Sequence, residues 1–153
     1  MKVSSAVLVV VCALSAALAA GCEEDACAPG FEREGGACVD SRLRLVGTWT
    51  VSETCSARGT SNYAGEIALD PAVPDGLLIS SFWNLFLTPV RASLSVDAIT
   101  VDRQEPDADS YFVQGTGVVE DEPGSLSFDY RVTDETDETA ILTDRCQSTW
   151  TAQ

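Results

Sequence analysis

The chain has 153 residues, 24 Asp and Glu against 9 Lys and Arg, and no His, so its formal net charge is −15 at pH 7. This acidity disfavours nucleic acid and anionic lipid surfaces as partners, because both attract basic proteins. The lack of His excludes Ser-His-Asp and Cys-His catalysis and the usual zinc sites. We therefore expect no catalytic residue, no cofactor and no metal, and we expect that the protein is not an enzyme.

Residues 1–21 are predicted to be a signal peptide. Lys2 is the only charge in this stretch, and an apolar run from Ala6 to Ala20 is interrupted only by Ser15. A basic start, an apolar core and small residues before a cleavage point are typical of secretion signals. The run is too short to span a membrane comfortably, which takes about 20 apolar residues.

The end of this segment, Leu18-Ala19-Ala20-Gly21-Cys22, resembles the lipobox of bacterial lipoproteins. The resemblance implies cleavage before Cys22 and lipid on its thiol, so that the exported protein would be attached to a membrane of the cell envelope. By the same resemblance, Glu23 favours the outer membrane in a Gram-negative cell. The alternative is an ordinary signal peptide cut after Ala19.

Residues 22–41 are predicted to be a tether that carries a small disulfide loop. Four cysteines remain after Cys12 and Cys22 are set aside, and an even number in an exported chain indicates two disulfides, with three connectivities. Proximity and the Gly and Pro content between them favour Cys27–Cys38. The other pair is then Cys55–Cys146. A metal site is the alternative, but paired C-x-x-C spacing is absent.

Residues 42–153 are predicted to form one all-β domain, in which the β pattern begins at Leu43. Apolar and polar residues alternate in several runs, which is typical of antiparallel strands over a single core. Cys55 is an even number of residues from Trp49 in the first run, and Cys146 is an even number from Trp150 in the last run. Each cysteine should therefore point to the same face of its strand as that apolar neighbour, toward the core. Turn signals separate about eight strands, which suits an up-and-down barrel or a barrel-like sandwich. The runs are 48–52, 63–69, 77–80, 90–97, 99–101, 111–119, 126–132 and 139–151.

Residues 77–87 depart from this alternation, because from Phe82 onward apolar residues occupy both even-numbered and odd-numbered positions. Either a strand at 77–80 turns into a short helical or irregular cap, or the segment is buried on both sides. Phe82, Trp83 and Phe86 are candidates for the mouth of an apolar ligand site. The other interpretation is a core plug that closes one end of a barrel, since aromatic clusters often fill cores.

The stretch Gly47-Thr48-Trp49 opens the first strand of this domain. It resembles the Gly-x-Trp opening of lipocalins and related calycin barrels, and residues 45–152 also resemble small lipocalin-like lipoproteins of bacteria. The resemblance implies a β-barrel in which Trp49 closes the floor.

Two functions remain open. One is binding of a small hydrophobic ligand in a lipocalin-like barrel. The other is a structural or protein-interaction module at the cell envelope, with a filled core and a protein partner that the sequence does not identify. Acidic turns can bind Ca²⁺, but we interpret these as solvated hairpin tips. The acidic turn residues are Asp107, Asp109, Asp134, Glu135, Asp137 and Glu138.

Overall fold

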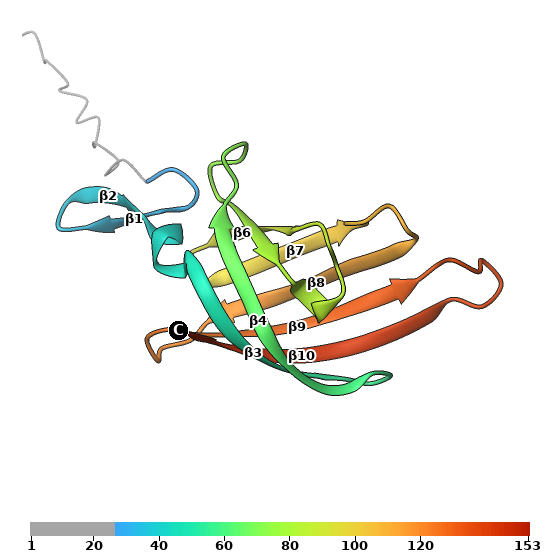
Figure 1. Cartoon of the computed structure of the whole chain (residues 1–153). Helices are drawn as coiled ribbons and strands as arrows, with labels where there is room; N and C mark the ends of the chain where they lie inside the picture. The colour runs from blue at the N-terminus through green and yellow to red at the C-terminus, as the bar shows by residue number, and fades with distance from the viewer. Residues whose placement is uncertain (1–26) are drawn as a thin grey trace, which may run out of the picture.

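The computed structural model describes residues 27–153 (Figure 1). The predicted signal peptide and Cys22 lie outside this range. A two-stranded hairpin and a short 3₁₀ helix precede eight further strands. Within the described range, no helix is long and apolar enough to cross a membrane. The elements are β1 (Phe31–Glu34), β2 (Ala37–Asp40), η1 (Ser41–Leu45), β3 (Gly47–Cys55), β4 (Gly59–Leu69), β5 (Gly76–Ser80), η2 (Phe82–Asn84), β6 (Val90–Ser95), β7 (Ala98–Gln104), β8 (Tyr111–Val119), β9 (Ser125–Asp134) and β10 (Leu142–Ala152).

Strands β3 to β10 form a closed antiparallel barrel (Figure 1). Each strand pairs with the next one in the chain, and β10 returns to pair with β3, with Trp150 opposite Val51. The predicted all-β fold is therefore confirmed, and of its two forms the barrel is the one observed. Closure leaves β3 and β10 without free edges, since each pairs on both sides.

Side chains fill the barrel interior. Each of the eight strands contributes at least one buried apolar side chain to a common core. At two of the inward glycines a side chain would collide with a ring: a Cβ atom at Gly65 would lie 2.4 Å from the Trp150 ring, and one at Gly117 2.6 Å from the Phe128 ring. A glycine inside a strand often marks such a close approach. These two glycines make room for large rings in a narrow barrel.

The barrel has two ends, which we call the floor end and the mouth end. The floor end carries η1 and the connections 70–75, 96–97 and 120–124. The mouth end carries the connections 56–58, 81–89, 105–110 and 135–141. In Figure 1 the β1–β2 hairpin lies beside the floor end, and the β9–β10 hairpin projects at the mouth end.

The region before β3 differs from the expectation in one respect. The β pattern was expected from Leu43, but Ser41–Leu45 forms η1 and the strand begins at Gly47. The helix is explained by its cap: the Asp40 side chain accepts a hydrogen bond from the backbone N–H of Arg42. The predicted tether is a β-hairpin between 31 and 40, so its stapled loop has regular structure.

Both predicted disulfides are present. Cys27–Cys38 links β2 to the chain ahead of β1, across a sequence separation of 11. Cys55–Cys146 joins β3 to β10 across a separation of 91. Both cysteines of the second pair are buried, as predicted from their even spacing from apolar residues on the same strands.

Candidate functional site: the barrel mouth

The segment 81–89 closes the mouth end from within. Strand β5 ends at Ser80 and the short 3₁₀ helix η2 follows, so the cap expected after residue 80 is observed. Phe82 is fully buried, and its ring centroid lies 4.5 Å from that of Tyr130 and 5.5 Å from that of Phe128. Phe82 is therefore part of the core plug rather than of an open mouth.

Trp83 and Phe86 lie on the outer side of that plug. Their ring centroids are 5.4 Å apart, and the Trp83 ring lies 5.8 Å from that of Tyr111 at the start of β8. Trp83 also lines a pocket at the mouth, whereas Phe86 packs behind it. Of the three candidate mouth residues, the structure therefore places only Trp83 at the pocket surface.

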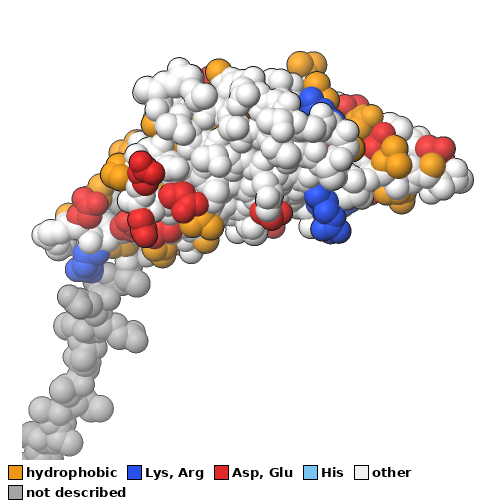
Figure 2. All heavy atoms as spheres, turned by 90° about the horizontal axis from the view of Figure 1, so that it is seen from below, with side chains coloured by type: hydrophobic (Ala, Val, Ile, Leu, Met, Phe, Trp, Pro, Cys, Tyr) orange, Lys and Arg blue, Asp and Glu red, His pale blue; other side chains and the backbone are white. Residues whose placement is uncertain are grey.

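This mouth pocket has a volume of about 390 Å³. Its wall is mainly apolar, formed by Trp83, Leu85, Tyr111, Val132 and Leu142, with charged groups at a few points. Pockets of roughly 300–1,000 Å³ with apolar walls and few polar groups are typical of small-molecule sites. Figure 2 shows apolar and acidic side chains gathered at the end of the molecule opposite to the β1–β2 hairpin.

The charged groups of the pocket are Arg58, Asp134 and Asp144. The Arg58 guanidinium lies over the Trp83 ring at 4.7 Å from its centroid, and its Nη1 donates to the Trp83 carbonyl oxygen at 2.8 Å. Arg58 therefore holds Trp83 from both its ring and its backbone. The pKa of Asp134 is lowered by hydrogen bonds from the side chain and backbone of Thr136.

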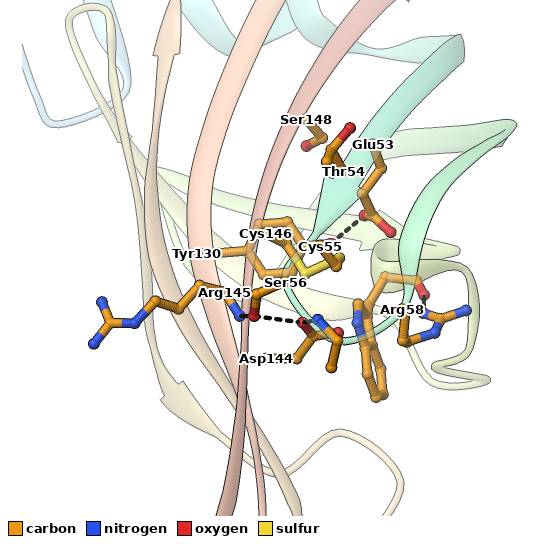
Figure 3. The surroundings of a disulfide bond; sticks show 12 residues. Glu53, Thr54, Cys55, Ser56, Arg58, Tyr130, Asp144, Arg145, Cys146 and Ser148 are labelled. Carbon is orange, nitrogen blue, oxygen red and sulfur yellow. Dashed lines mark hydrogen bonds between the residues drawn. A yellow bond between two sulfur atoms is a disulfide. The ribbon is translucent and has the colours of Figure 1, made fainter.

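Asp144 anchors the turn between β3 and β4. Its Oδ1 accepts hydrogen bonds from Ser56 Oγ at 3.0 Å and from the backbone N–H of Ala57 at 2.7 Å. Figure 3 shows Asp144 beside the Cys55–Cys146 disulfide, with the Arg145 side chain pointing away from it. The other carboxylate oxygen of Asp144, Oδ2, is buried and has no hydrogen-bond partner in the described part of the chain.

The backbone of the plug segment is strained. Ser81, Trp83 and Asn84 have φ angles of 57°, 57° and 51°, in the left-handed region that favours glycine. Such residues cost roughly 1–3 kcal/mol each and cluster at ligand clamps and switch regions. The strain lies in the same segment that positions the Trp83 ring in the pocket.

A buried polar cluster lies inside the barrel, and the sequence analysis did not single it out. Glu53 is 1% exposed, and its Oε2 accepts hydrogen bonds from Tyr63 Oη at 2.7 Å and from Tyr130 Oη. Burial, together with the Glu53 carboxylate, raises the pKa of both Tyr hydroxyls, so they stay protonated and donate. The sequence held one signal for this cluster: Glu53 is two residues from both Val51 and Cys55, so its side chain points to the same inward face of β3.

Trp49 lies at the floor end, where the lipocalin resemblance implied that it would be. Its indole Nε1 donates to the Leu45 carbonyl oxygen of η1 at 3.0 Å, and the ring is buried. Arg42 is also buried: its Nη1 donates to the carbonyl oxygens of Val73 and Gly76, and its Nη2 pairs with Asp40 at 2.8 Å. These contacts join η1 to the barrel floor.

The acidic turns use their carboxylates on neighbouring backbone groups. Asp107 accepts hydrogen bonds from the backbone N–H groups of Leu87 and Thr88. Asp134 and Asp137 accept them from Thr136 and Thr139, respectively. Such turns need no ion to explain them.

Cys55, Asp144 and Cys146 place potential metal ligands within 4.8 Å of one another. The two sulfur atoms are bonded to each other as a disulfide, so neither is a free thiolate ligand.

Comparison with known proteins finds similarity of fold. No protein-family model matches the chain, and no curated protein matches its sequence. A solved structure of a redesigned β-barrel, b11L5F_LGL, has 22% identity and a TM-score of 0.50, over 72% of this chain and 93% of that one. The barrel EF1p2_mFAP2b bound to DFHBI has 21% identity and a TM-score of 0.49, over 72% and 95%. The redesigned barrel mFAP1 bound to DFHBI has 18% identity and a TM-score of 0.47, over 71% and 95%.

Proposed function

We propose that the protein is an exported, lipid-anchored lipoprotein whose lipocalin-like barrel binds a small, largely apolar molecule in the mouth pocket. It acts as a binding protein rather than an enzyme. The observation that carries the binding role is the mouth pocket itself, with its apolar wall and few charged groups. The filled core restricts the ligand to the mouth, because the Phe82 plug separates the pocket from the interior.

The anchoring part of the proposal rests on the lipobox resemblance at Cys22. A lipid chain contributes about 0.8 kcal/mol for each buried CH₂ group, so more than one chain gives stable attachment. In bacteria fed labelled palmitate, we expect label in the wild-type protein and none in the Cys22→Ser variant. Export of an unlabelled protein cut after Ala19 would contradict the anchor.

The ligand is tested by native mass spectrometry of the exported Cys22→Ser variant. We expect a co-purifying small mass that is lost when Trp83→Ala is added. The matched control is Phe112→Ala, which removes an aromatic ring that contacts Arg103 rather than the pocket. A mass that survives Trp83→Ala, or an apo protein that takes up no added hydrophobic dye, would contradict binding at the mouth.

A second function, a protein-interaction module, is favoured by one observation. Large apolar side chains are exposed at the mouth end, where Leu85 is 53% and Leu142 67% exposed. Exposed apolar surface can mark a site of protein contact. Photo-crosslinkers at these two positions would give protein adducts in whole cells if this function holds, and none if the pocket takes only a small molecule.

A further inference from the structure

Two buried side-chain polar atoms in residues 27–153 have no hydrogen-bond partner: Trp83 Nε1 and Asp144 Oδ2. Both residues line the mouth pocket. A buried polar atom without a partner costs about 1–3 kcal/mol, and most proteins have few of them. Their occurrence in one pocket indicates a common cause.

Both side chains are held by other contacts, so neither atom is a spare group on a loose side chain. Trp83 is 6% exposed and is fixed by the guanidinium and hydrogen bond of Arg58. Asp144 is 7% exposed, and its Oδ1 is already used by the turn that follows β3. The pocket therefore contains one donor and one acceptor that are buried and unpartnered within residues 27–153, each on a side chain with other contacts.

We infer that Trp83 Nε1 and Asp144 Oδ2 recognise a ligand that joins an apolar body to a group with both an acceptor and a donor. A primary carboxamide or a lactam-like heterocycle is such a group: its carbonyl accepts from the indole N–H, and its N–H donates to the carboxylate. This inference rests on the proposed binding function and narrows the class of ligand. The apolar body would lie against Leu85, Tyr111 and Leu142 of the same pocket.

Simpler ligand chemistries match the polar groups of this pocket less well. A carboxylate ligand would bring a negative charge beside Asp134 and Asp144. An ammonium ligand would be attracted by the same two carboxylates, but it has donors only and would leave the Trp83 N–H unmatched. A neutral group with both functions avoids both conflicts.

The plug segment supplies the small movement that binding requires. Trp83 Nε1 and Asp144 Oδ2 are covered in this structure, so a ligand reaches them only if the Trp83 ring shifts. Residues 81–84 include three non-glycine residues with positive φ, and leaving that conformation would release strain. The strained backbone and the unpartnered indole therefore lie in the same segment.

The test uses ¹⁵N-labelled, exported Cys22→Ser protein and the indole N–H signals of its three Trp residues. Trp49 and Trp150 serve as internal references, because their Nε1 groups already donate to Leu45 and Ser148. Trp83→Phe assigns the remaining signal. The probes are 2-naphthamide, the similarly sized 2-acetonaphthone, naphthalene-2-carboxylate and 2-naphthylmethylammonium. The ketone keeps the acceptor and lacks the donor.

We expect 2-naphthamide to shift the Trp83 indole signal, to leave the two references in place, and to bind at least about tenfold more tightly than the other probes. Asp144→Asn keeps an oxygen for the turn but replaces the acceptor with an amide, so the preference for amide over ketone should fall below about twofold. Asp121→Asn, an exposed carboxylate change at the floor end, should leave the preference unchanged.

The outcomes separate this inference from the proposed function. If all probes bind equally and shift Tyr111 and Leu142 without moving the Trp83 indole signal, the polar pair is wrong and binding at the mouth stands. If no probe shifts any residue of the pocket, both proposals fail.

Discussion

The two ends of the barrel are each closed by a 3₁₀ helix and a Trp side chain, yet they differ in how well their polar groups are satisfied. At the floor end the Trp49 indole donates to Leu45, and the buried Arg42 binds backbone carbonyls and Asp40. At the mouth end the Trp83 indole has no partner within residues 27–153, and three residues of 81–84 have positive φ, whereas Val96 is the one such non-glycine residue in the floor connections 70–75, 96–97 and 120–124.

The difference shows which end is built for stability. A satisfied buried network gives a well-ordered structure, whereas an unsatisfied donor and a strained backbone are retained where function requires them. The mouth end is therefore the part of the barrel in which we place binding. Each of the following predictions tests this contrast, from the largest expected effect to the smallest.

The disulfides give the largest expected effect. Replacing Cys55 and Cys146 by Ser opens a covalent link across 91 residues, and should lower the free energy of unfolding by about 4–5 kcal/mol. Replacing Cys27 and Cys38 opens a separation of 11 in the floor hairpin, and should cost about 3 kcal/mol or less. Urea denaturation followed by Trp fluorescence measures both. Equal effects would contradict the larger contribution expected from the longer closed loop.

Matched Trp→Phe changes compare the two closures directly. Trp49→Phe leaves the Leu45 carbonyl without its buried donor and should cost about 1–3 kcal/mol. Trp83→Phe removes an N–H that has no partner among the described residues, so its cost should stay within about 1 kcal/mol. Thermal and urea unfolding of both variants give the comparison. A larger loss for Trp83→Phe would contradict the assignment of the floor as the satisfied end.

The floor end should respond to acid through Asp40. The hydrogen bond from Arg42 holds the pKa of this carboxyl below its ordinary value of 3.8. A carboxyl group with a lowered pKa stabilises the folded state above pH 3.8, and this contribution is lost as the pH falls through the folded-state pKa. Asp40→Asn should remove this contribution, about 1 kcal/mol, because the buried Arg42 then loses its charged partner. The difference in free energy of unfolding between the two proteins should therefore be smaller at pH 3 than at pH 7.

The smallest effect concerns strain at the mouth. Ser81→Gly should raise the free energy of unfolding by ~0.5 kcal/mol, because glycine adopts the positive φ of this residue without steric cost. The control, Ser95→Gly at the end of β6, should lower it by about 0.5–1 kcal/mol, as expected for glycine in a strand. If both changes destabilise equally, the plug segment does not store strain.

Much of the fold could be predicted from the sequence because its signals are local. Alternation of apolar and polar residues identifies strands, and turn residues separate them, so the eight-stranded β architecture followed from the sequence. The even spacing of Cys55 and Cys146 from buried residues on their strands likewise supported the prediction that they pair. Local signals were weaker before β3, where the Asp40 cap turns Leu43 into part of a helix.

The candidate site was harder to predict. Phe82, Trp83 and Phe86 are alike in the sequence, yet one fills the core, one lines the pocket and one packs behind it. Asp144 and Tyr111 were not singled out, because no local pattern brings β8 and β10 to the same pocket. Glu53 was also missed, although its parity pointed inward, because charged residues are rarely buried without a partner.

The sequence by itself determined the alternation, the turns and the cysteine facing, and with them a disulfide-linked antiparallel β domain of about eight strands, either a barrel or a barrel-like sandwich. These features depend on neighbours in the chain, for which a period of two is enough. Only the tertiary structure decided that Glu53 meets Tyr63 and Tyr130 and that Trp83 and Asp144 share a pocket. Such meetings depend on barrel closure, which brings together side chains from strands that are far apart in the sequence.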